Sequence, residues 1–493
     1  MEWLEHWGWT AALAVIGIIA IWLAVMYVQD ITQTKHTVLR NFPIVGRMRY
    51  RFEKLGEYFR QYFFSHDREE MPFNRATRAW VYRTAKGLGG LLGFGSTNDL
   101  REPGSIIFVS AAYALLEEEY TPTPSRIIGE QCDKPFEAKS LFNISGMSYG
   151  AISAAAVSAL SKGAGKCGIW MNTGEGGLSP YHLEGNGDVI FQVGTAKYGV
   201  RDSDGNLSDA RLREVSQYVK AFEIKMSQGA KPGRGGVLPG NKVTKEISEI
   251  RGIPVGKVSS SPNRHKEIKS PDDLLNMINR IREVSGRPVG YKAVIGSEES
   301  IRDLCEAIHR RGRDFAPDFI TVDGGDGGTG AAPQLLADHV GLPLNESLPM
   351  LVDTLIEYDL KDRVKVIASG KLVHSAKVAW ALCMGADFIV SARGFMFALG
   401  CIQSMQCHED SCPTGITTHN KRRQRGLVVA DKAERVHQYA HWVNHEVNVL
   451  AHSCGLPNAR DFRREHLRLV LNPGTSMPLN VMHPYPDIKF PLL

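Results

Sequence analysis

Short apolar runs alternate with glycine-rich loops and helical stretches along the chain from about residue 140. This alternation is typical of βα units that build a parallel sheet. Eight apolar runs are candidate strands, and they lie at Leu141–Ile144, Ile169–Asn172, Val189–Val193, Phe222–Met226, Val289–Val294, Phe319–Val322, Val364–Ala368 and Phe388–Val390. Eight strands with intervening helices predict a closed (β/α)8 barrel. A doubly wound open sheet is the competing fold, but no G-x-G-x-x-G motif follows the first strand to support it.

Glycine and polar residues follow almost every candidate strand, from Gly146-Met-Ser-Tyr149 after the first to Ala392-Arg-Gly394 after the eighth. Barrel active sites form at the C-terminal ends of the strands. These loops therefore favour the barrel and predict where its chemistry lies. A long excursion over residues 227–285 separates the fourth and fifth strands. A loop of that length inside a compact domain usually carries function.

The N-terminus has a different pattern, because residues 10–28 are apolar and carry no charge. A run of this length predicts a transmembrane helix. Glu2 and Glu5 precede it, whereas basic residues crowd the segment that follows, which places the bulk of the chain in the cytoplasm. We expect a single-pass protein of the cell (inner) membrane with a cytoplasmic catalytic domain. A buried helix of a soluble protein is the alternative.

These patterns predict five parts of the chain. They are a short extracytoplasmic N-terminus (1–9), a transmembrane helix (10–28), a juxtamembrane and connecting region (29–135), the barrel (136–430) and a C-terminal extension (431–493). The formal charge of +5 is modest, and no signature of nucleic-acid binding accompanies it. Eight cysteines in 493 residues do not make a disulfide framework.

Three of those cysteines stand close together after the last strand, as Cys401, Cys407 and Cys412, and a proline follows the third. Thiolates this dense suggest an iron–sulfur cluster and therefore one-electron transfer. Zinc is the inorganic alternative, although it prefers four ligands and tighter cysteine spacing. Cys454 remains open as a fourth ligand, so the residues alone leave a three-iron and a four-iron cluster both possible.

Glycine-rich loops after the last three strands suggest a phosphate site. They are Gly327-Gly328-Thr329-Gly330, Ser369-Gly370 and Arg393-Gly394. Their backbone N–H groups can bind one anion, and barrels commonly hold phosphate after strands seven and eight. Lys292 lies within the fifth strand and Lys225 within the fourth. Each is either a charged group in the barrel mouth, where it can stabilise a reduced flavin, or a strand-edge lysine that reaches solvent.

Residues 140–420 resemble the FMN-binding domain of the glutamate synthase family. The matching runs are Gly146-Met-Ser-Tyr-Gly150, Asn172-Thr-Gly-Glu-Gly-Gly177, Ile224-Lys-Met-Ser-Gln-Gly-Ala-Lys-Pro-Gly233, Leu238-Pro-Gly-Asn-Lys-Val243, Gly327-Gly-Thr-Gly-Ala331 and the cysteine run with Gly400 before it. The resemblance implies an FMN-containing (β/α)8 barrel with a [3Fe–4S] cluster. The cluster ligands would be Cys401, Cys407 and Cys412.

The resemblance also assigns roles to individual residues. The flavin contacts would be Met147, Asn172, Gln192, Lys292, Gly328, Thr329, Ser369, Gly370 and Gly394. Contacts to 2-oxoglutarate would be Glu175, Gln228, Lys231 and Arg251. Lys231 and Arg251 offer positive charge for the two carboxylates. Lys292 would stabilise the reduced flavin, and Glu175 is the candidate acid or base.

The chain departs from the family pattern in the lysine loop. The family continues that loop as Pro-Gly-Glu-Gly-Gly-Gln, whereas this chain reads Pro232-Gly-Arg234-Gly-Gly-Val237. Valine cannot donate a hydrogen bond, so the acceptor pocket is expected to differ. Full-length glutamate synthases also begin with a glutaminase domain that uses an N-terminal cysteine, whereas this sequence begins with the apolar segment. The expected ammonia is therefore free or supplied by a partner, and the electrons come from ferredoxin or a separate reductase.

The predicted function is the FMN- and iron–sulfur-dependent reductive amination of 2-oxoglutarate. Two alternatives remain. One is a membrane-tethered flavin and iron–sulfur oxidoreductase that acts on another amine or hydroxy acid, which Arg234 and Val237 favour. The other is a non-catalytic barrel scaffold, against which the intact cysteines and glycine runs argue.

Overall fold

Eight parallel strands close into one barrel in the computed structural model, which describes residues 2–490, with side chains from residue 6 onward. Around the barrel the strands are β4 (Phe142–Ile144), β5 (Met171–Asn172), β6 (Val189–Val193), β7 (Ala221–Lys225), β10 (Val289–Ala293), β11 (Phe319–Asp323), β12 (Lys365–Ser369) and β13 (Phe388–Ser391). All eight predicted strands are present in the predicted order. The closed barrel is confirmed and the open sheet is excluded, since β13 pairs back onto β4.

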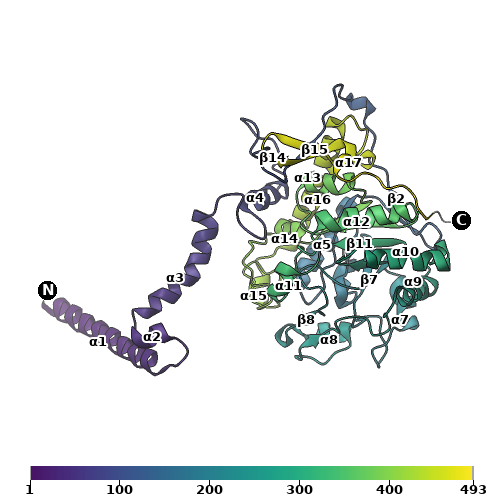
Figure 1. Cartoon of the computed structure of the whole chain (residues 1–493). Helices are drawn as coiled ribbons and strands as arrows, with labels where there is room; N and C mark the ends of the chain where they lie inside the picture. The colour runs from purple at the N-terminus through teal and green to yellow at the C-terminus, as the bar shows by residue number, and fades with distance from the viewer. Residues whose placement is uncertain (1, 491–493) are drawn as a thin grey trace. The chain divides into compact units, whose positions relative to one another are not determined.

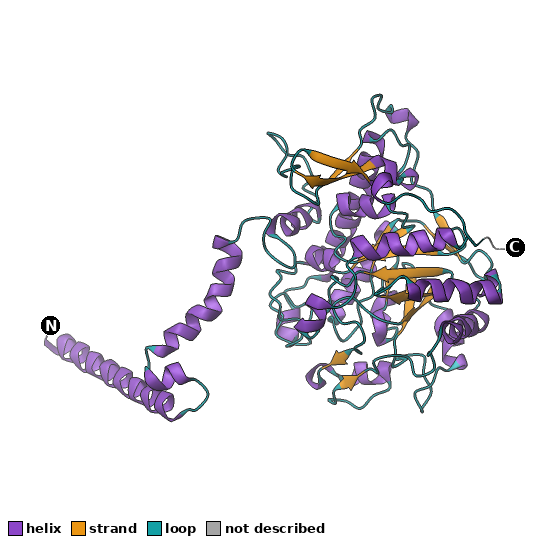
Figure 2. Cartoon of the chain, in the orientation of Figure 1, coloured by secondary structure: helices purple, strands orange, loops and turns teal. Residues whose placement is uncertain are grey.

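Helices follow the strands and surround the barrel, as Figures 1 and 2 show. They are α5 (Ala154–Cys167), α6 (Pro180–Leu183), α7 (Asp209–Ser216), α9 (Pro271–Ser285), α10 (Glu299–Arg311), α11 (Gln334–His339), α12 (Leu344–Glu357), α13 (Ser375–Cys383) and α14 (Arg393–Leu399). Their ends follow ordinary capping rules. In α5, Ser153 accepts a hydrogen bond from the Ala156 N–H at the start, and Gly168 adopts a left-handed conformation at the end.

The N-terminal end of the barrel is filled by apolar side chains and covered by a hairpin. Strands β2 (Arg126–Ile128) and β3 (Phe136–Ala138) pair antiparallel and join the buried core of the barrel. Phe136 packs edge-on against Trp170, which in turn packs against Phe388. This end is therefore a packed core, and the open end lies at the C-terminal ends of the strands.

Two fully desolvated carboxylates stabilise the same N-terminal end. Asp318 precedes β11 and accepts hydrogen bonds from Arg282 Nε at 3.1 Å and from the Val289 N–H at 2.7 Å. Asp387 precedes β13 and accepts from Lys361 Nζ and from the Val366 N–H, both at 2.8 Å. Each carboxylate joins a strand to its neighbour, because its partners belong to adjoining βα units.

The excursion after β7 forms a small subdomain over the open end. Strands β8 (Val237–Leu238) and β9 (Ser259–Ser260) pair antiparallel, and α8 (Lys245–Arg251) lies between them in the chain. Thr244 caps α8 by accepting from the Ile247 N–H. The excursion ends where α9 begins, at Pro271. It is therefore shorter than the predicted range of residues 227–285.

The last part of the chain packs onto the barrel. The cysteine loop leads to α15 (Lys421–Gln424), and α16 (Val429–Ser453) then packs along α5, where Gly163 allows close approach to Val436. Strand β1 (Ile106–Phe108) pairs with β14 (Leu467–Asn472), which pairs with β15 (Thr475–Pro478); α17 (Leu479–Met482) follows. In Figure 1 this sheet is marked by the yellow strands.

The chain divides into two compact units, residues 1–78 and 79–493, and the division falls within α4 (Arg75–Thr84). The first unit contains α1 (Glu2–Thr32), α2 (Thr37–Asn41) and α3 (Gly46–Phe59). Asp30 forms an ion pair with Arg47 at 2.7 Å and also accepts from the Ile44 N–H, and a second buried ion pair joins Arg78 to Glu70 at 2.6 Å. In α1, residues 6–32 are long and apolar enough to cross a membrane by length and composition.

Candidate active site

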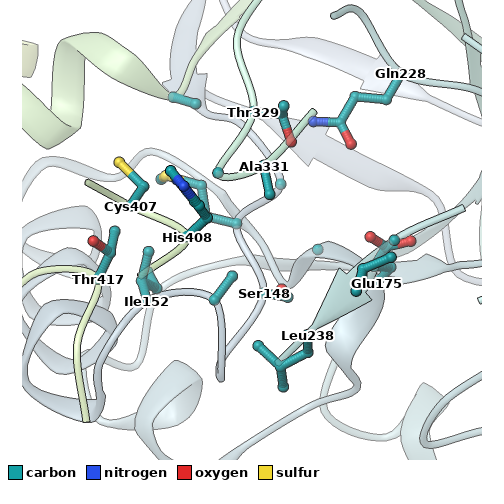
Figure 3. Close-up of a pocket in the computed structure, with 18 of the residues that line it drawn as sticks. Ser148, Ile152, Glu175, Gln228, Leu238, Thr329, Ala331, Cys407, His408 and Thr417 are labelled. Atoms are coloured by element: carbon teal, nitrogen blue, oxygen red, sulfur yellow. The ribbon is translucent and has the colours of Figure 1, made fainter. Parts of the chain in front are cut away.

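A cleft opens at the C-terminal ends of the barrel strands and is lined by the loops that follow most of them. The space in it that protein atoms leave empty, including solvent at its open mouth, is about 1060 Å³. In Figure 3, Cys407 and His408 lie at one end of the cleft and Glu175 at the other, with Ser148 and Ala331 between them. The cleft is long enough to place two different chemistries at its ends.

A buried ion pair occupies the Glu175 end. Lys225 ends β7, Glu175 follows β5, and their Nζ and Oε1 atoms lie 3.1 Å apart. Burial alone would raise the pKa of Glu175, but the positive charges of Lys225, Lys231 and Arg251 lower it to about 2. The carboxyl group is therefore ionised near neutral pH. In that state it can accept a proton but cannot donate one.

Two further cations line the cleft without a carboxylate partner in the described part of the chain. Lys231 and Arg251 are 7% and 5% exposed, and neither forms an ion pair within residues 6–490. The Arg251 guanidinium donates to the Tyr149 carbonyl at 3.1 Å and lies over the Tyr198 ring, while its Nε has no hydrogen-bond partner. Burial, and then the neighbouring Lys225, lowers the pKa of Lys231. Buried charges of this kind are destabilising until an anion pairs with them.

Glu223 of β7 organises the polar groups inside the barrel. It is buried, and one of its oxygens accepts from both Asn172 Nδ2 at 2.8 Å and Gln192 Nε2 at 2.6 Å. Its other oxygen accepts from Thr321 Oγ1 at 2.6 Å. Because both amide groups donate to Glu223, their carbonyl oxygens face away from it. Asn172 Oδ1 then accepts from the Gly174 N–H, which fixes the turn after β5.

Lys292 of β10 lies in a second buried group centred on Asp323. Lys292 Nζ is 3.2 Å from Asp323 Oδ2, and Ser369 Oγ donates to Asp323 Oδ1 at 2.7 Å. The Gly229 N–H also donates to this carboxylate. Burial alone would lower the pKa of Lys292, but the charges of Asp323 and Glu223 raise it. Lys292 is therefore a protonated, buried cation and not a strand-edge lysine that reaches solvent.

The loop after β11 has the geometry of an anion cradle. Gly328, Thr329 and Gly330 line the cleft, and within residues 2–490 their backbone N–H groups have no acceptor. Arg393 follows β13 and donates to the Thr329 carbonyl, which holds its guanidinium beside these groups. At Gly146, an added Cβ would lie 2.8 Å from Asn172 Oδ1, so the wall opposite Asn172 must be glycine. Free donors, a cation and a close backbone wall fit a phosphorylated flavin such as FMN.

The three clustered cysteines lie in the loop between α14 and α15. Burial is the main cause that raises the pKa of Cys401, and charges on Cys407 and Cys412 raise it further, so the three sulfurs lie within electrostatic reach. Arg393 Nη1 lies 3.8 Å from Cys407 Sγ, and Lys242 donates to the Cys407 carbonyl. Nevertheless, within residues 6–490 no three cysteine, histidine or acidic side chains are placed to ligate one metal ion. The loop supplies three thiols of the kind that bind iron–sulfur clusters, in which each cysteine binds a different iron.

The structure brings together most of the residues that the sequence singled out. Those that line the cleft are Met147, Glu175, Gln192, Gln228, Lys231, Arg251, Gly328, Thr329, Arg393 and Cys407. Those that do not line it are Asn172, Lys292, Gly327, Ser369, Gly370, Gly394, Cys401 and Cys412. Asn172 connects to the cleft through Glu223, which also accepts from Gln192, whereas Lys292 and Ser369 both bind Asp323. At Gly394 the reason for glycine is packing, since a Cβ would lie 2.1 Å from Tyr439 Oη.

Sequence reasoning missed Glu223, Asp323 and Lys242. Glu223 and Lys225 stand at alternate positions of an otherwise apolar strand, which places both on the barrel interior. That spacing was a usable signal for Glu223. Lys242 offered no comparable signal, because its partners are backbone carbonyls of a loop far along the chain. Of the two departures from the family pattern, Val237 lines the cleft and Arg234 is an exposed residue outside it.

Comparison with known proteins agrees with the site. The family model described as the conserved region in glutamate synthase matches residues 96–457. The glutamate synthase large subunit-like protein YerD of Bacillus subtilis is 39% identical over 516 residues, covering 96% of this chain and 98% of that protein. The archaeal-type NADPH glutamate synthase of Thermotoga neapolitana is 32% identical, covering 76% of this chain and 71% of that protein.

Among solved structures, a chimera of (S)-mandelate dehydrogenase is similar with a TM-score of 0.48 and 11% identity, over 79% of this chain and 98% of that one. That likeness is too weak to bear on chemistry. The family-model match over residues 96–457 shows the family. So does the 39% identity to YerD, which extends over nearly the full length of both chains. On these grounds the chain belongs to the glutamate synthase family, a family of oxidoreductases.

Proposed function

We propose that this protein is an FMN-dependent oxidoreductase that reductively aminates a keto diacid, 2-oxoglutarate, with ammonia. The observation that carries the proposal is the pair of buried cations, Lys231 and Arg251, which line the cleft without a carboxylate partner in the described part of the chain. A dianionic substrate would supply both missing counter-charges. Family membership supports the same reaction class.

Substrate binding follows from the positions of these side chains. Arg251 is held by Tyr149 and Tyr198, so its free Nε–H has a fixed direction. Lys231 is a second cation, and Gln228 adds a polar side chain to the same wall. The keto diacid condenses with ammonia, losing water to give an imine, which a hydride and a proton convert to the amino acid. Glu175 is ionised, so its role is to accept a proton during condensation.

FMN, when bound, supplies the hydride for that last step. Its phosphate would meet the free N–H groups of Gly328, Thr329 and Gly330, with Arg393 alongside. Lys292 would offer the flavin a fixed positive charge, because Asp323 keeps it protonated and in place. Glu223 would fix the orientation of the Gln192 side chain, which lines the cleft, and of Asn172, whose Oδ1 accepts from the Gly174 N–H.

An iron–sulfur cluster on Cys401, Cys407 and Cys412 is the proposed entry point for electrons from ferredoxin or a separate reductase. The support is chemical: the thiols share one loop, and Arg393 and Lys242 stabilise negative charge there. We also propose that α1 anchors the protein in the cell membrane, with the barrel on the cytoplasmic side.

Absorption and paramagnetic resonance spectra of anaerobically purified protein test both cofactors at once. A flavin spectrum together with a three-iron signal is expected. The reduced protein is then mixed with 2-oxoglutarate and ammonium, and flavin reoxidation and glutamate formation are measured. The Arg251→Met variant is the matched control, because it should keep its flavin and need a much higher keto acid concentration for the same rate. Reduced flavin that 2-oxoglutarate and ammonium leave unchanged would refute the proposed reaction.

Val237 favours one alternative substrate. It is half-exposed and lines the cleft beside Leu238 and Pro239, which gives this wall an apolar surface next to the cations. An acid with one carboxylate and an apolar substituent would match that wall better than a second carboxylate. Reoxidation by such a keto acid, but not by 2-oxoglutarate, would identify an oxidoreductase for another amine or hydroxy acid.

A further inference from the structure

An apolar loop, residues 87–95, projects from the barrel unit directly after α4. Its sequence is Gly-Leu-Gly-Gly-Leu-Leu-Gly-Phe-Gly. Leu88 and Leu92 are 64% and 60% exposed, Leu91 is 95% exposed and Phe94 is fully exposed. Scattered exposed apolar residues need no explanation, but four large ones within seven positions form a patch that marks an interaction site.

The root of this apolar loop is fixed, whereas its tip is free of contacts. At Gly89 an added Cβ would meet the Trp442 ring at 3.4 Å, and at Gly90 it would lie 2.7 Å from Glu446 Oε1, so the root rests closely on α16. At Gly93 and Gly95 an added Cβ would meet nothing within 4 Å. A loop whose base packs on the fold while its apolar tip projects from it is suited to insertion into an apolar phase outside the protein. It is not suited to packing within the fold.

The charges at the base of the loop indicate that this apolar phase is a lipid membrane. Arg83 and Lys86 are exposed, and within residues 6–490 neither has an ion-pair partner. Apolar side chains beside unpaired cations are the chemistry of a membrane interface, where the former enter the acyl boundary and the latter meet anionic headgroups. The interleaved glycines give the tip no fixed shape. A specific protein interface requires shape complementarity, whereas a lipid surface does not.

We propose that the apolar loop of residues 87–95 inserts into the surface of an anionic lipid bilayer and holds the barrel unit against the membrane. The inference is independent of the catalytic reaction. The proposed membrane span of α1 matters to it only because the loop follows α1 in the same chain, so that the span would keep the loop near the membrane. The loop would thereby give the barrel a second lipid contact in addition to its tether.

The test uses the full chain reconstituted into vesicles of phosphatidylcholine and phosphatidylglycerol. A photoreactive p-benzoylphenylalanine is placed at position 94, and at position 218 as the matched control, since Tyr218 is an exposed aromatic residue elsewhere on the same unit. Irradiation should give lipid adducts several-fold more abundant at position 94 than at position 218. Arg83→Gln with Lys86→Gln should lower the yield at position 94.

The proposal is overturned by equal yields at the two positions, by no adduct at position 94, or by an adduct there to a second copy of the chain. Alkaline carbonate extraction of the same vesicles tests α1 separately. Release of the chain by carbonate would refute the membrane span of α1. The photoadduct at position 94 could still be measured in that case, by vesicle flotation. Flavin absorbance of each sample confirms that the barrel is folded.

Discussion

Lys242 Nζ donates to the carbonyl oxygen of Cys407 at 2.9 Å, although 165 residues separate the two in the chain. The same ammonium group donates to the Thr417 carbonyl at 2.7 Å and is almost fully buried. Lys242 stands in the excursion that carries Arg251, whereas Cys407 stands in the cysteine loop. One buried cation therefore joins the substrate side of the cleft to its cysteine side.

Replacing Lys242 with Met should loosen the cysteine loop without emptying the flavin site. Methionine keeps the volume but removes both hydrogen bonds, each worth about 1 kcal/mol or more when the donor is charged. We expect faster amide hydrogen exchange over residues 401–417 and reduced iron content. Lys245→Met, at a neighbouring exposed lysine, is the control. Exchange that is the same in both variants would contradict this tethering role.

Lys292→Met should weaken flavin retention or slow turnover at least about tenfold, equivalent to roughly 1.4 kcal/mol. The variant removes a protonated group from the barrel and leaves Asp323 without its ion-pair partner. Flavin content per chain and the rate of flavin reoxidation measure the effect. Lys365→Met is the control, because Lys365 also belongs to a barrel strand but its Nζ bonds the Asp362 carbonyl outside the cleft. Normal flavin content and normal rate would rule out the role given to Lys292.

Arg251→Met should raise the KM for the keto acid and leave flavin content unchanged. A charge-assisted hydrogen bond contributes roughly 1.5–3 kcal/mol, so the expected increase is about 10- to 100-fold. Arg234→Met is the matched control, since Arg234 is exposed and does not line the cleft. The measurement is the initial rate against keto acid concentration. A similar KM in the two variants would show that Arg251 does not bind the substrate.

Stability should fall as the pH drops from about 6.5 to about 4. Burial lowers the pKa of both His182 and His265 to about 4, so both are neutral in the folded protein at neutral pH. Between these pH values the unfolded chain binds more protons than the folded chain, and the free energy of unfolding therefore rises with pH. Each histidine contributes roughly 2–3 kcal/mol to this change.

Thermal unfolding measured across that pH range tests the assignment. His265→Gln should reduce the slope of melting temperature against pH, whatever it does to the melting temperature at neutral pH. His408→Gln, at an exposed histidine, should leave the slope unchanged. An unaltered slope in the His265 variant would mean that other groups cause the acid sensitivity.

Asp318→Ala should destabilise the barrel by about 3–5 kcal/mol, because Arg282 and Arg363 would be left buried without their shared carboxylate. The free energy of unfolding by urea measures this loss. Asp314→Ala, at a nearby exposed residue, should change stability little. The flavin spectrum of the folded fraction should be normal in both, since Asp318 lies at the end of the barrel away from the cleft. Equal stability of the two variants would refute the structural role of Asp318.

The barrel was predictable because strand identity depends on local apolar runs, and β4 to β13 follow those runs to within two residues. The same reasoning found Lys292 and the glycine loop at Gly328, since a charge inside a strand or a glycine run is visible in the sequence. It could not find the contact between Lys242 and Cys407, which depends on how two loops fold over the barrel. The cluster on Cys401, Cys407 and Cys412 stays a prediction, because spacing in the sequence does not determine where sulfur atoms point.

Strand β1 pairs with β14, so residues 106–108 are made long before their partners at 467–469. At a translation rate of roughly 5–20 residues per second, the early strand waits on the order of tens of seconds for the late one. Throughout this interval β14, the central strand of the small sheet, is missing. The unpaired backbone groups of β1 remain available to chaperones or to neighbouring chains. A nascent chain cut short before residue 467 would keep the whole barrel sequence yet lack both β14 and β15, which leaves β1 without a partner strand.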